Sequence, residues 1–108
     1  MSYKIEVTAL FEKQVKKLAK KFPALKKEFA QLIVSLKENP QQGTPISNHC
    51  YKIRLAIASK GKGKRGGARV ITHIQVINNK IFLLTIYDKS ELENLTDKEI
   101  ESMIKLIP

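Results

Sequence analysis

Residues 51–58 read YKIRLAIA, and residues 68–87 read ARVITHIQVINNKIFLLTIY. The first stretch alternates aliphatic or aromatic residues with Lys52, Arg54 and two alanines, which is typical of a strand with one face on the core. The second stretch holds two strand-like runs separated by Asn78-Asn79, and this arrangement predicts a hairpin. Its second run, IFLLTIY, is apolar at nearly every position, as expected of a central strand. Together these residues predict three neighbouring strands in the middle of a sheet.

The residues before this stretch predict a strand and a helical hairpin. Tyr3 to Val7 alternates as a half-buried strand does, and Thr8 can cap the helix that follows. Two apolar stripes then recur at helical spacing, separated by Pro23, which is poorly tolerated inside a helix. The first stripe consists of Phe11, Val15, Leu18 and Phe22, and the second of Leu25, Phe29, Leu32, Ile33 and Leu36. The second helix is expected to end at Asn39 and Pro40.

A capping box predicts one more helix near the C-terminus. Thr96-Asp97-Lys98-Glu99 has the required form, and an apolar stripe follows it at Ile100, Met103, Ile104 and Ile107. Two segments are interpreted as loops: residues 40–48, and the basic run SKGKGKRGG at residues 59–67. The element order is then β-α-α-β-β-β-α, an α+β fold in which the helical hairpin packs on a mostly antiparallel sheet. A chain of 108 residues fits a single domain, residues 1–108.

The net charge of +10 is distributed unevenly. No Asp or Glu occurs between Glu38 and Asp88, whereas eight basic residues lie there: Lys52, Arg54, Lys60, Lys62, Lys64, Arg65, Arg69 and Lys80. A basic field of this kind raises the local concentration of polyanions, and its usual partner is nucleic acid. The alternative is a lysine-rich surface that serves solubility alone.

Several other classes of protein are disfavoured. No stretch approaches the roughly 18 apolar residues of a membrane span, and the N-terminus lacks the apolar region of a signal peptide, so a cytoplasmic protein is expected. Cys50 is the single cysteine, which excludes a disulfide within one chain. A metal site from His49, Cys50 and His73 is not expected, because no carboxylate lies nearby in the sequence. The loop GKGKRGG lacks the spacing of a nucleotide-binding Walker motif.

Side chains two positions apart in a strand point to the same side, so the polar face of the predicted sheet can be assembled from the sequence. The first strand contributes Lys52 and Arg54. The second contributes Arg69, His73 and Gln75, while Val70, Thr72, Ile74 and Val76 fit the core. The third contributes Thr85, Tyr87 and then Lys89, opposite Phe82, Leu84 and Ile86. We expect this face to be open to water, with the basic loop at its rim.

Clustered cations suit RNA cleavage without a metal or other cofactor. RNA carries its own nucleophile, the 2′-hydroxyl, so an enzyme needs a base, cations for the phosphate oxygens and an acid for the leaving group. Lys52 is the candidate base, because Arg54 and Arg69 beside it would favour loss of its proton. The two arginines would bind the phosphate through bidentate contacts. Further charge or the leaving-group proton could come from Lys64, Arg65 or Lys89.

Tyr87 and the remaining cations complete the candidate site. Tyr87 would stack on a base or handle a proton, although an amphipathic residue at a strand end is an equally good interpretation. RNA-binding residues are expected at Lys60, Lys62, Lys64, Arg65 and His73. His49 and His73 offer an alternative acid-base pair, but nothing in the sequence brings them together.

Residues 51–96 also carry a resemblance. The combination of K-x-R, G-K-G-K-x-G-G-x-R-V and L-L-T-I-Y-x-K resembles the RelE/ParE superfamily of type II toxins, most closely its HigB branch. The resemblance implies a ribosome-dependent endoribonuclease that cuts mRNA in the decoding site by attack of the 2′-hydroxyl. It also implies a cognate antitoxin as partner. The basic residues of the family fall here on Lys52, Arg54 and Arg69 and, in addition, on Lys64, Arg65 and Lys89.

Two other functions stay open. ParE-type members of the superfamily poison DNA gyrase and need no nuclease residues, and a basic RNA-binding module without chemistry would show the same charge. The cationic strand face favours the nuclease over both. Cleavage of mRNA would leave 2′,3′-cyclic phosphate ends, which neither alternative predicts.

Overall fold

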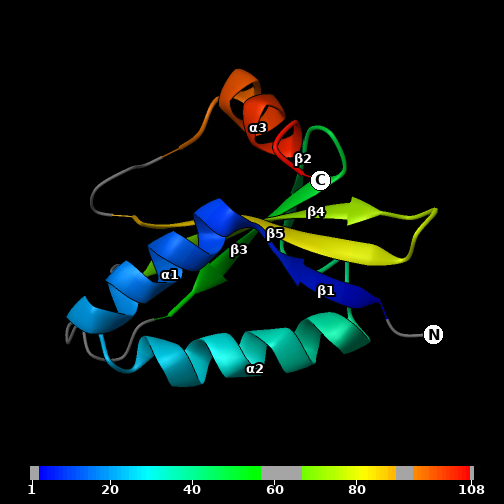
Figure 1. Ribbon diagram of the computed structural model, residues 1–108. Coiled ribbons are helices and arrows are strands. Elements are labelled where there is room, and N and C mark those ends of the chain that lie inside the picture. Colours follow the sequence, from blue (N-terminus) through cyan, green and yellow to red (C-terminus); the bar gives the residue numbers. More distant parts are fainter. Residues whose placement is uncertain (1–2, 57–66, 90–93, 108) are drawn as a thin grey trace.

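The computed structural model describes residues 3–56, 67–89 and 94–107, and Figure 1 shows their arrangement. Its strands are β1 (Lys4–Val7), β2 (Thr44–Ile46), β3 (Cys50–Leu55), β4 (Ala68–Gln75) and β5 (Lys80–Asp88). Its helices are α1 (Ala9–Lys21), α2 (Leu25–Glu38) and α3 (Asp97–Ile104). The strands form one mixed sheet in the order β1-β5-β4-β3-β2. The pair β1 and β5 is parallel, and the other neighbours are antiparallel.

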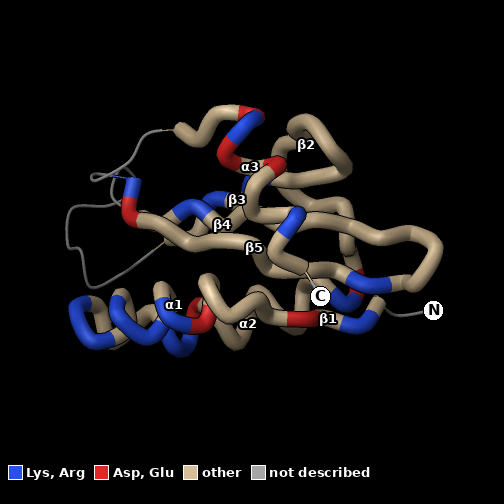
Figure 2. The backbone as a smooth tube through the Cα atoms, turned by 45° about the horizontal axis from the view of Figure 1, so that its top comes forward, with Lys and Arg blue, Asp and Glu red and all other residues tan. Residues whose placement is uncertain are grey.

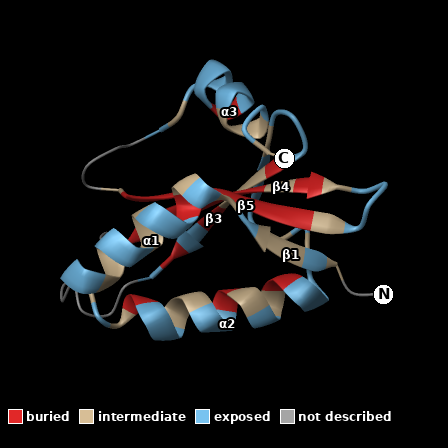
Figure 3. Cartoon of the chain, viewed as in Figure 1, coloured by how far each residue is buried: buried red, intermediate tan, exposed pale blue. Residues whose placement is uncertain are grey.

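The sheet separates two apolar layers. One face packs against α1 and α2, with Phe11, Leu25, Leu36, Leu83 and Ile86 among its buried residues. The other face packs against α3 around a smaller cluster that consists of Cys50, Ile71, Phe82, Leu84, Tyr87 and Ile100. Figure 3 shows the consequence, since the central strands β4 and β5 are buried along most of their length while the helices are exposed on their outer sides. The nearly continuous apolar run of β5 thus reflects cover on both faces.

Both predicted N-caps are present. The Thr8 side chain accepts a hydrogen bond from the Phe11 backbone N–H at 3.2 Å, and α1 begins directly after it. Thr96 and Glu99 form a reciprocal capping box at the start of α3. Each cap satisfies backbone N–H groups that the first turn of a helix leaves without a partner. Within the described residues, no helix is long and apolar enough to cross a membrane.

The loop predicted at residues 40–48 contains a strand that the sequence did not indicate. Thr44–Ile46 pairs with β3 at the edge of the sheet. A three-residue strand with Pro45 in its middle is too short to show an alternating pattern in the sequence. Proline is tolerated there because an edge strand needs backbone donors on one side alone. Gly43 permits the approach to β3: it has φ +99°, and a Cβ atom there would lie 2.6 Å from the Lys52 carbonyl oxygen.

A β-bulge in β5 corrects the predicted side-chain alternation. The register between β4 and β5 shifts between Ile71 and Thr72, so that Leu84 is an extra residue in β5. Tyr87 therefore lies on the same face as Phe82 and Leu84, not opposite to them as predicted. Thr85 is buried and its hydroxyl donates to Gln14 of α1, so it does not belong to the polar face.

The backbone groups at the bulge are satisfied by α1. The Thr8 hydroxyl lies 3.0 Å and 3.2 Å from the carbonyl oxygens of Leu83 and Leu84, to which it can donate. The Gln14 side-chain oxygen accepts from the Ile86 backbone N–H at 3.2 Å. The bulge is therefore held by two polar side chains of one helix.

Val76, predicted in the core, lies beyond the end of β4 and is 62% exposed.

Candidate active site

The strand register brings three of the predicted site residues into one row across the sheet. Arg54 of β3 lies opposite Arg69 of β4, and Arg69 lies opposite Tyr87 of β5. Directly opposed residues in a sheet point to the same face and have Cβ atoms roughly 5 Å apart. The row lies on the α3 face of the sheet, because Tyr87 belongs to the cluster around Ile100. Convergence of the two arginines and the tyrosine is thus a property of the backbone.

Lys52 lies beside this row, two positions before Arg54 on the same strand and opposite Ile71. Its ammonium nitrogen donates to the Asn94 side-chain oxygen at 3.2 Å, just before α3 begins. Lys52, Tyr87 and Asn94 line one small cavity of about 60 Å³ between the sheet and α3. The cavity thus connects the candidate base with the tyrosine.

The face is less open than predicted. Arg54 is exposed and Lys52 is half-buried, but Arg69 and Tyr87 are each 7% exposed. The correction has a physical cause, since Cys50, Ile71, Phe82 and Leu84 make this side of the sheet apolar and α3 covers it. The cationic row therefore sits at the margin of an apolar layer, and an arginine near low-dielectric material acts more strongly on an anion than one in water.

Tyr87 carries a perturbed hydroxyl. Burial raises the pKa of Tyr87 above its ordinary value, and the positive charge of Arg69 partly opposes that shift. Within the described part of the chain, the hydroxyl oxygen has no hydrogen-bond partner although it is buried. A buried polar atom without a partner is costly, and a catalytic role is one reason for a native protein to keep such an atom. The neutral phenol is a donor suited to an incoming anion.

Two predicted residues lie away from the row. Lys89 follows the end of β5, where its backbone N–H donates to the Gly67 carbonyl at 3.0 Å, so it lies at the same end of the sheet as Arg69. His73 is four residues beyond Arg69 on β4, roughly 13 Å along the strand. The predicted RNA-binding residues Lys60, Lys62, Lys64 and Arg65 lie outside the described residues.

The two histidines do approach each other, contrary to expectation. Asn48 and His49 have φ near +60°, and this turn directs the chain so that His49 and His73 line one groove. Burial lowers the pKa of His73, the hydrogen bond to the Asn48 carbonyl raises it, and the charge of His49 lowers it further. The Arg54–Arg69–Tyr87 row lies at the other end of the strands, so the histidine pair and the row are separate.

Cys50 joins this histidine end without the features of a ligand. Its sulfur lies 3.6 Å from His73 Nδ1, and burial raises the pKa of the thiol to about 12. A metal ligand must be the thiolate, which burial disfavours. Across residues 3–56, 67–89 and 94–107, no three His, Cys, Asp or Glu side chains are grouped as a metal site requires.

Asn94 was missed by sequence reasoning. It lies in the segment before the Thr96 capping box, and its relation to Lys52 depends on where α3 docks. A second contact holds the same helix, because the Ser47 hydroxyl donates to the Asp97 carboxylate at 2.9 Å. Asp97 also lines the small cavity, so a carboxylate lies near the cations but is already engaged. No periodic pattern in the sequence signals either contact.

The arrangement provides the parts that phosphodiester cleavage needs. Two guanidinium groups in register can hold the non-bridging oxygens of a phosphate, an amine lies on the same strand face, and a neutral phenol lies next to Arg69. The surrounding apolar layer limits the water that would screen these charges.

A family model and several solved structures match this chain. A family model described as RelE toxin of the RelE/RelB toxin-antitoxin system matches residues 8–107. The fold is similar to that of a free E. coli RelE toxin with two arginines replaced by alanine, with a TM-score of 0.66, 16% identity and full coverage of both chains. It is also similar to isolated E. coli RelE, with a TM-score of 0.60 and 15% identity over 98% of this chain and 100% of that one.

A third similar structure contains a partner. It is the intact E. coli RelBE toxin-antitoxin complex, with a TM-score of 0.57 and 17% identity over 79% of this chain and 94% of that one. At these identities the structural likeness shows the fold alone. The family itself is shown by the family model, which spans nearly the whole chain. The chain therefore belongs to the family of RelE toxins of toxin-antitoxin systems.

Proposed function

We propose that this RelE-family chain is a ribosome-dependent mRNA endoribonuclease of the HigB type, which cleaves RNA through its 2′-hydroxyl without a metal. The observation that carries the proposal is the register of Arg54, Arg69 and Tyr87 across three strands, with Lys52 beside them. This arrangement supports recognition of a single phosphate by several donors. A surface charged for solubility alone has no need of a buried arginine opposite a buried tyrosine.

Each of these residues takes part in the proposed reaction. Lys52 removes the 2′-hydroxyl proton, and the oxygen then attacks the adjacent phosphorus to give a 2′,3′-cyclic phosphate. Arg69 and Arg54 bind the non-bridging oxygens, where negative charge increases in the transition state. Tyr87 donates a hydrogen bond to the same phosphate or stacks on the neighbouring base. Lys89, at the same end of the sheet, supplies the proton to the 5′-oxygen leaving group.

We further propose a cognate antitoxin as the protein partner. The structure of the E. coli RelBE complex, to which this fold is similar, contains such a pair. The net charge of +10 supports binding to the ribosome and to mRNA, whose phosphates dominate their surfaces. No small-molecule cofactor is needed for the chemistry assigned to these residues.

The proposal is tested by incubating the purified chain with mRNA in the presence and absence of ribosomes and mapping the new RNA ends. We expect cuts with 2′,3′-cyclic phosphate ends that require ribosomes. Arg69→Ala and Lys52→Ala should each reduce the cleavage rate by roughly 10²- to 10³-fold, because each removes a group that acts in the transition state.

Lys27→Ala is the matched control, since it removes one exposed lysine from α2 on the opposite side of the sheet. Thermal unfolding followed by circular dichroism establishes that each variant is folded, and Lys52→Ala carries the test if loss of buried Arg69 prevents folding. Intact messages with a DNA-damage response on expression would instead support a gyrase poison. Binding of RNA without cleavage would support a non-catalytic module.

A further inference from the structure

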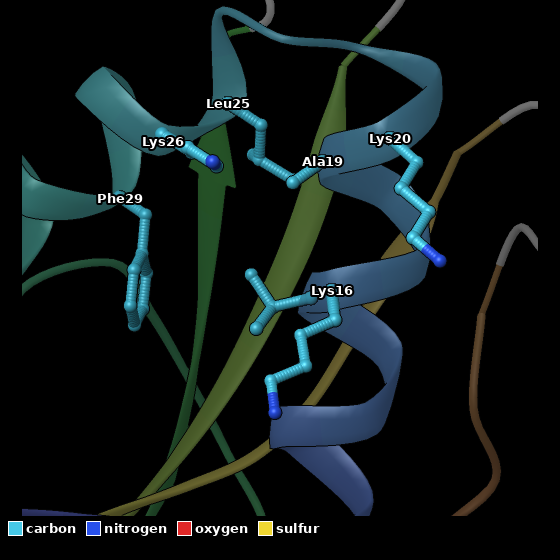
Figure 4. A pocket seen from close by; sticks show the side chains of 7 residues that line it. Lys16, Ala19, Lys20, Leu25, Lys26 and Phe29 are labelled. Carbon is cyan, nitrogen blue, oxygen red and sulfur yellow. The ribbon is translucent and has the colours of Figure 1, made fainter.

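A groove lies between α1 and α2, on the side of the molecule away from the candidate active site. It has a volume of about 420 Å³ and is lined by seven residues, shown in Figure 4. Its floor is apolar and consists of Val15, Ala19, Leu25 and Phe29. The groove lies next to the turn that joins the two helices, where they begin to separate (Figure 1). A surface of this kind is the usual receptor for the apolar face of a third helix.

The rim of the groove is basic. Lys16 and Lys20 of α1 and Lys26 of α2 line it, and the lining set includes no Asp or Glu. All three lysines are exposed. Lys16 lies 3.4 Å from Glu12, but both side chains are mostly in water, where such a pair is weak and easily exchanged. Figure 2 shows how densely Lys and Arg follow α1 as a whole.

Protein suits the groove better than RNA does. Nucleic acid binds to charge combined with exposed aromatic faces, and it gains little from an aliphatic floor. The aromatic ring in the groove, Phe29, is half-buried with its centroid 5.6 Å from that of Phe11, so it is committed to the core. An apolar stripe on a helix can bury against Val15 and Ala19 while acidic residues on both sides of the stripe reach the lysines.

A second copy of this chain is a poorer occupant. Its helix α1 carries the same basic charge as the rim and would be repelled. Its helix α3 is acidic enough, but the apolar residue Ile100 of that helix is 2% exposed and packed on the sheet. Withdrawal of α3 would uncover the whole cluster around Tyr87.

We propose that the groove between α1 and α2 binds an amphipathic helix of a partner protein, one with an apolar stripe flanked by acidic residues. The inference rests on the proposed function in one respect, because that proposal supplies an antitoxin as the protein with such a helix. It does not depend on RNA cleavage. The groove and the Arg54–Arg69–Tyr87 row use different residues from opposite faces of the sheet, so the two sites can be tested separately.

The test uses the full chain and a fluorescent synthetic peptide of about 20 residues, long enough for five helical turns. The peptide carries leucines at helical spacing and glutamates beside them, and a scrambled peptide of equal composition is the control. Fluorescence anisotropy should give a dissociation constant of roughly 10 µM for the amphipathic peptide and much weaker binding for the scrambled one.

Two charge-reversed variants separate the groove from the general charge of α1. Lys16→Glu with Lys20→Glu should weaken binding of the amphipathic peptide by about tenfold or more. Lys13→Glu with Lys17→Glu has the same spacing, the same helix and the same change of net charge, but neither residue lines the groove. This control pair should change binding by less than about threefold in about 0.15 M salt, where long-range attraction is screened.

A third variant addresses the apolar floor. Ala19→Met adds volume to the groove without a change of charge and should weaken peptide binding by about fivefold. The proposal is overturned if both charge-reversed pairs act alike, if the scrambled peptide binds equally, or if Ala19→Met has no effect. It is also overturned if peptide binding does not depend on Lys16 and Lys20 whereas binding of an RNA hairpin does. The same holds if self-association of the chain, measured by sedimentation, depends on these two lysines and peptide binding does not.

The cleavage assay on the same proteins keeps the two proposals apart. Both proposals are supported if the double variant Lys16→Glu with Lys20→Glu loses peptide binding but still cuts mRNA. A native chain that binds the peptide but never cuts mRNA contradicts the proposed nuclease and leaves the groove assignment standing.

Discussion

At the scale of single residues, Tyr87 and His73 are two groups whose pKa values are shifted by burial. Tyr87 buries a hydroxyl that, among the described residues, has no hydrogen-bond partner, and burial raises its pKa. His73 is half-buried and its pKa is lowered, mainly by burial. The Tyr87 shift lowers stability only above about pH 10 and the His73 shift only below about pH 6.5, where the unfolded chain would carry the charged form.

Replacement of Tyr87 by phenylalanine should separate stability from function. The change removes a buried hydroxyl that has no described partner, so the free energy of unfolding should stay constant or rise by about 1 kcal/mol. RNA cleavage should fall if the hydroxyl contacts the phosphate and should persist if the ring only stacks. Urea denaturation and the cleavage assay measure the two effects. Tyr51→Phe is the control, because Tyr51 lies on the face of the sheet that α1 and α2 cover. A marked loss of stability in Tyr87→Phe would contradict the expected result.

The stability of the protein should fall as the pH is lowered through the range in which histidine titrates. The folded-state pKa of His73 lies below the 6.5 of an ordinary histidine, so the unfolded chain binds a proton more readily. The contribution of His73 is therefore complete above about pH 6.5 and is lost as the pH falls toward its folded pKa. Urea denaturation at about pH 7.5 and about pH 5 should show a smaller loss for His73→Gln than for the native chain. His49→Gln should have a lesser effect, since the charge of His49 is the last of the causes.

At the scale of elements, the contact between α1 and the bulge of β5 decides which side chains meet at the site. Thr8 and Gln14 bind backbone groups of β5 at Leu83, Leu84 and Ile86. These contacts hold the extra residue of the strand, which places Phe82 and Leu84 on the same face as Tyr87, the partner of Arg69. A change in α1 should therefore affect the opposite face of the sheet.

The two threonine N-caps provide a matched pair for this effect. Thr96→Ala removes a capping box on the surface and should cost about 1 kcal/mol of unfolding free energy. Thr8→Ala removes a cap of the same kind together with hydrogen bonds to β5, so it should cost about 2 kcal/mol and should also reduce RNA cleavage. Chemical denaturation measures both costs. Equal costs for the two variants would show that the contacts with the bulge contribute nothing.

At the scale of the whole molecule, positive charge occurs on more than one surface. The Arg54–Arg69–Tyr87 row lies on the α3 side of the sheet, whereas the lysines of α1 lie on the other side (Figure 2). Residues 57–66 contribute four further basic side chains by sequence. Such a distribution attracts polyanions over long distances before any specific contact forms.

Binding of RNA should accordingly depend steeply on salt. With about four phosphate contacts, the logarithm of the binding constant should fall with the logarithm of salt concentration with a slope near −3. A 2′-O-methyl RNA, which cannot be cleaved by the proposed route, measures this slope by anisotropy. Replacement of Lys60, Lys62, Lys64 and Arg65 by serine should make the slope shallower, while Thr96→Ala should leave it unchanged. A slope near zero for the native chain would exclude the phosphate backbone as the ligand.

The amino-acid sequence by itself determined the three helices and every strand of the described residues except β2. Alternation in YKIRL placed Lys52 and Arg54 on one face of β3, and capping residues located the starts of α1 and α3. These features depend on residues within one turn or one strand of each other, so local periodicity and local hydrogen bonds are sufficient to predict them. The resemblance to RelE toxins rested on the same local motifs.

The tertiary structure alone decided that Phe82 and Leu84 share the face of Tyr87, that Arg69 is buried and that His49 meets His73. Each of these depends on partners distant in the chain: Gln14 and Thr8 at the bulge, α3 over the sheet, and a left-handed turn at Asn48 and His49. An extra residue in a strand reverses all later side chains, and neither its position nor its support can be read from a periodic pattern.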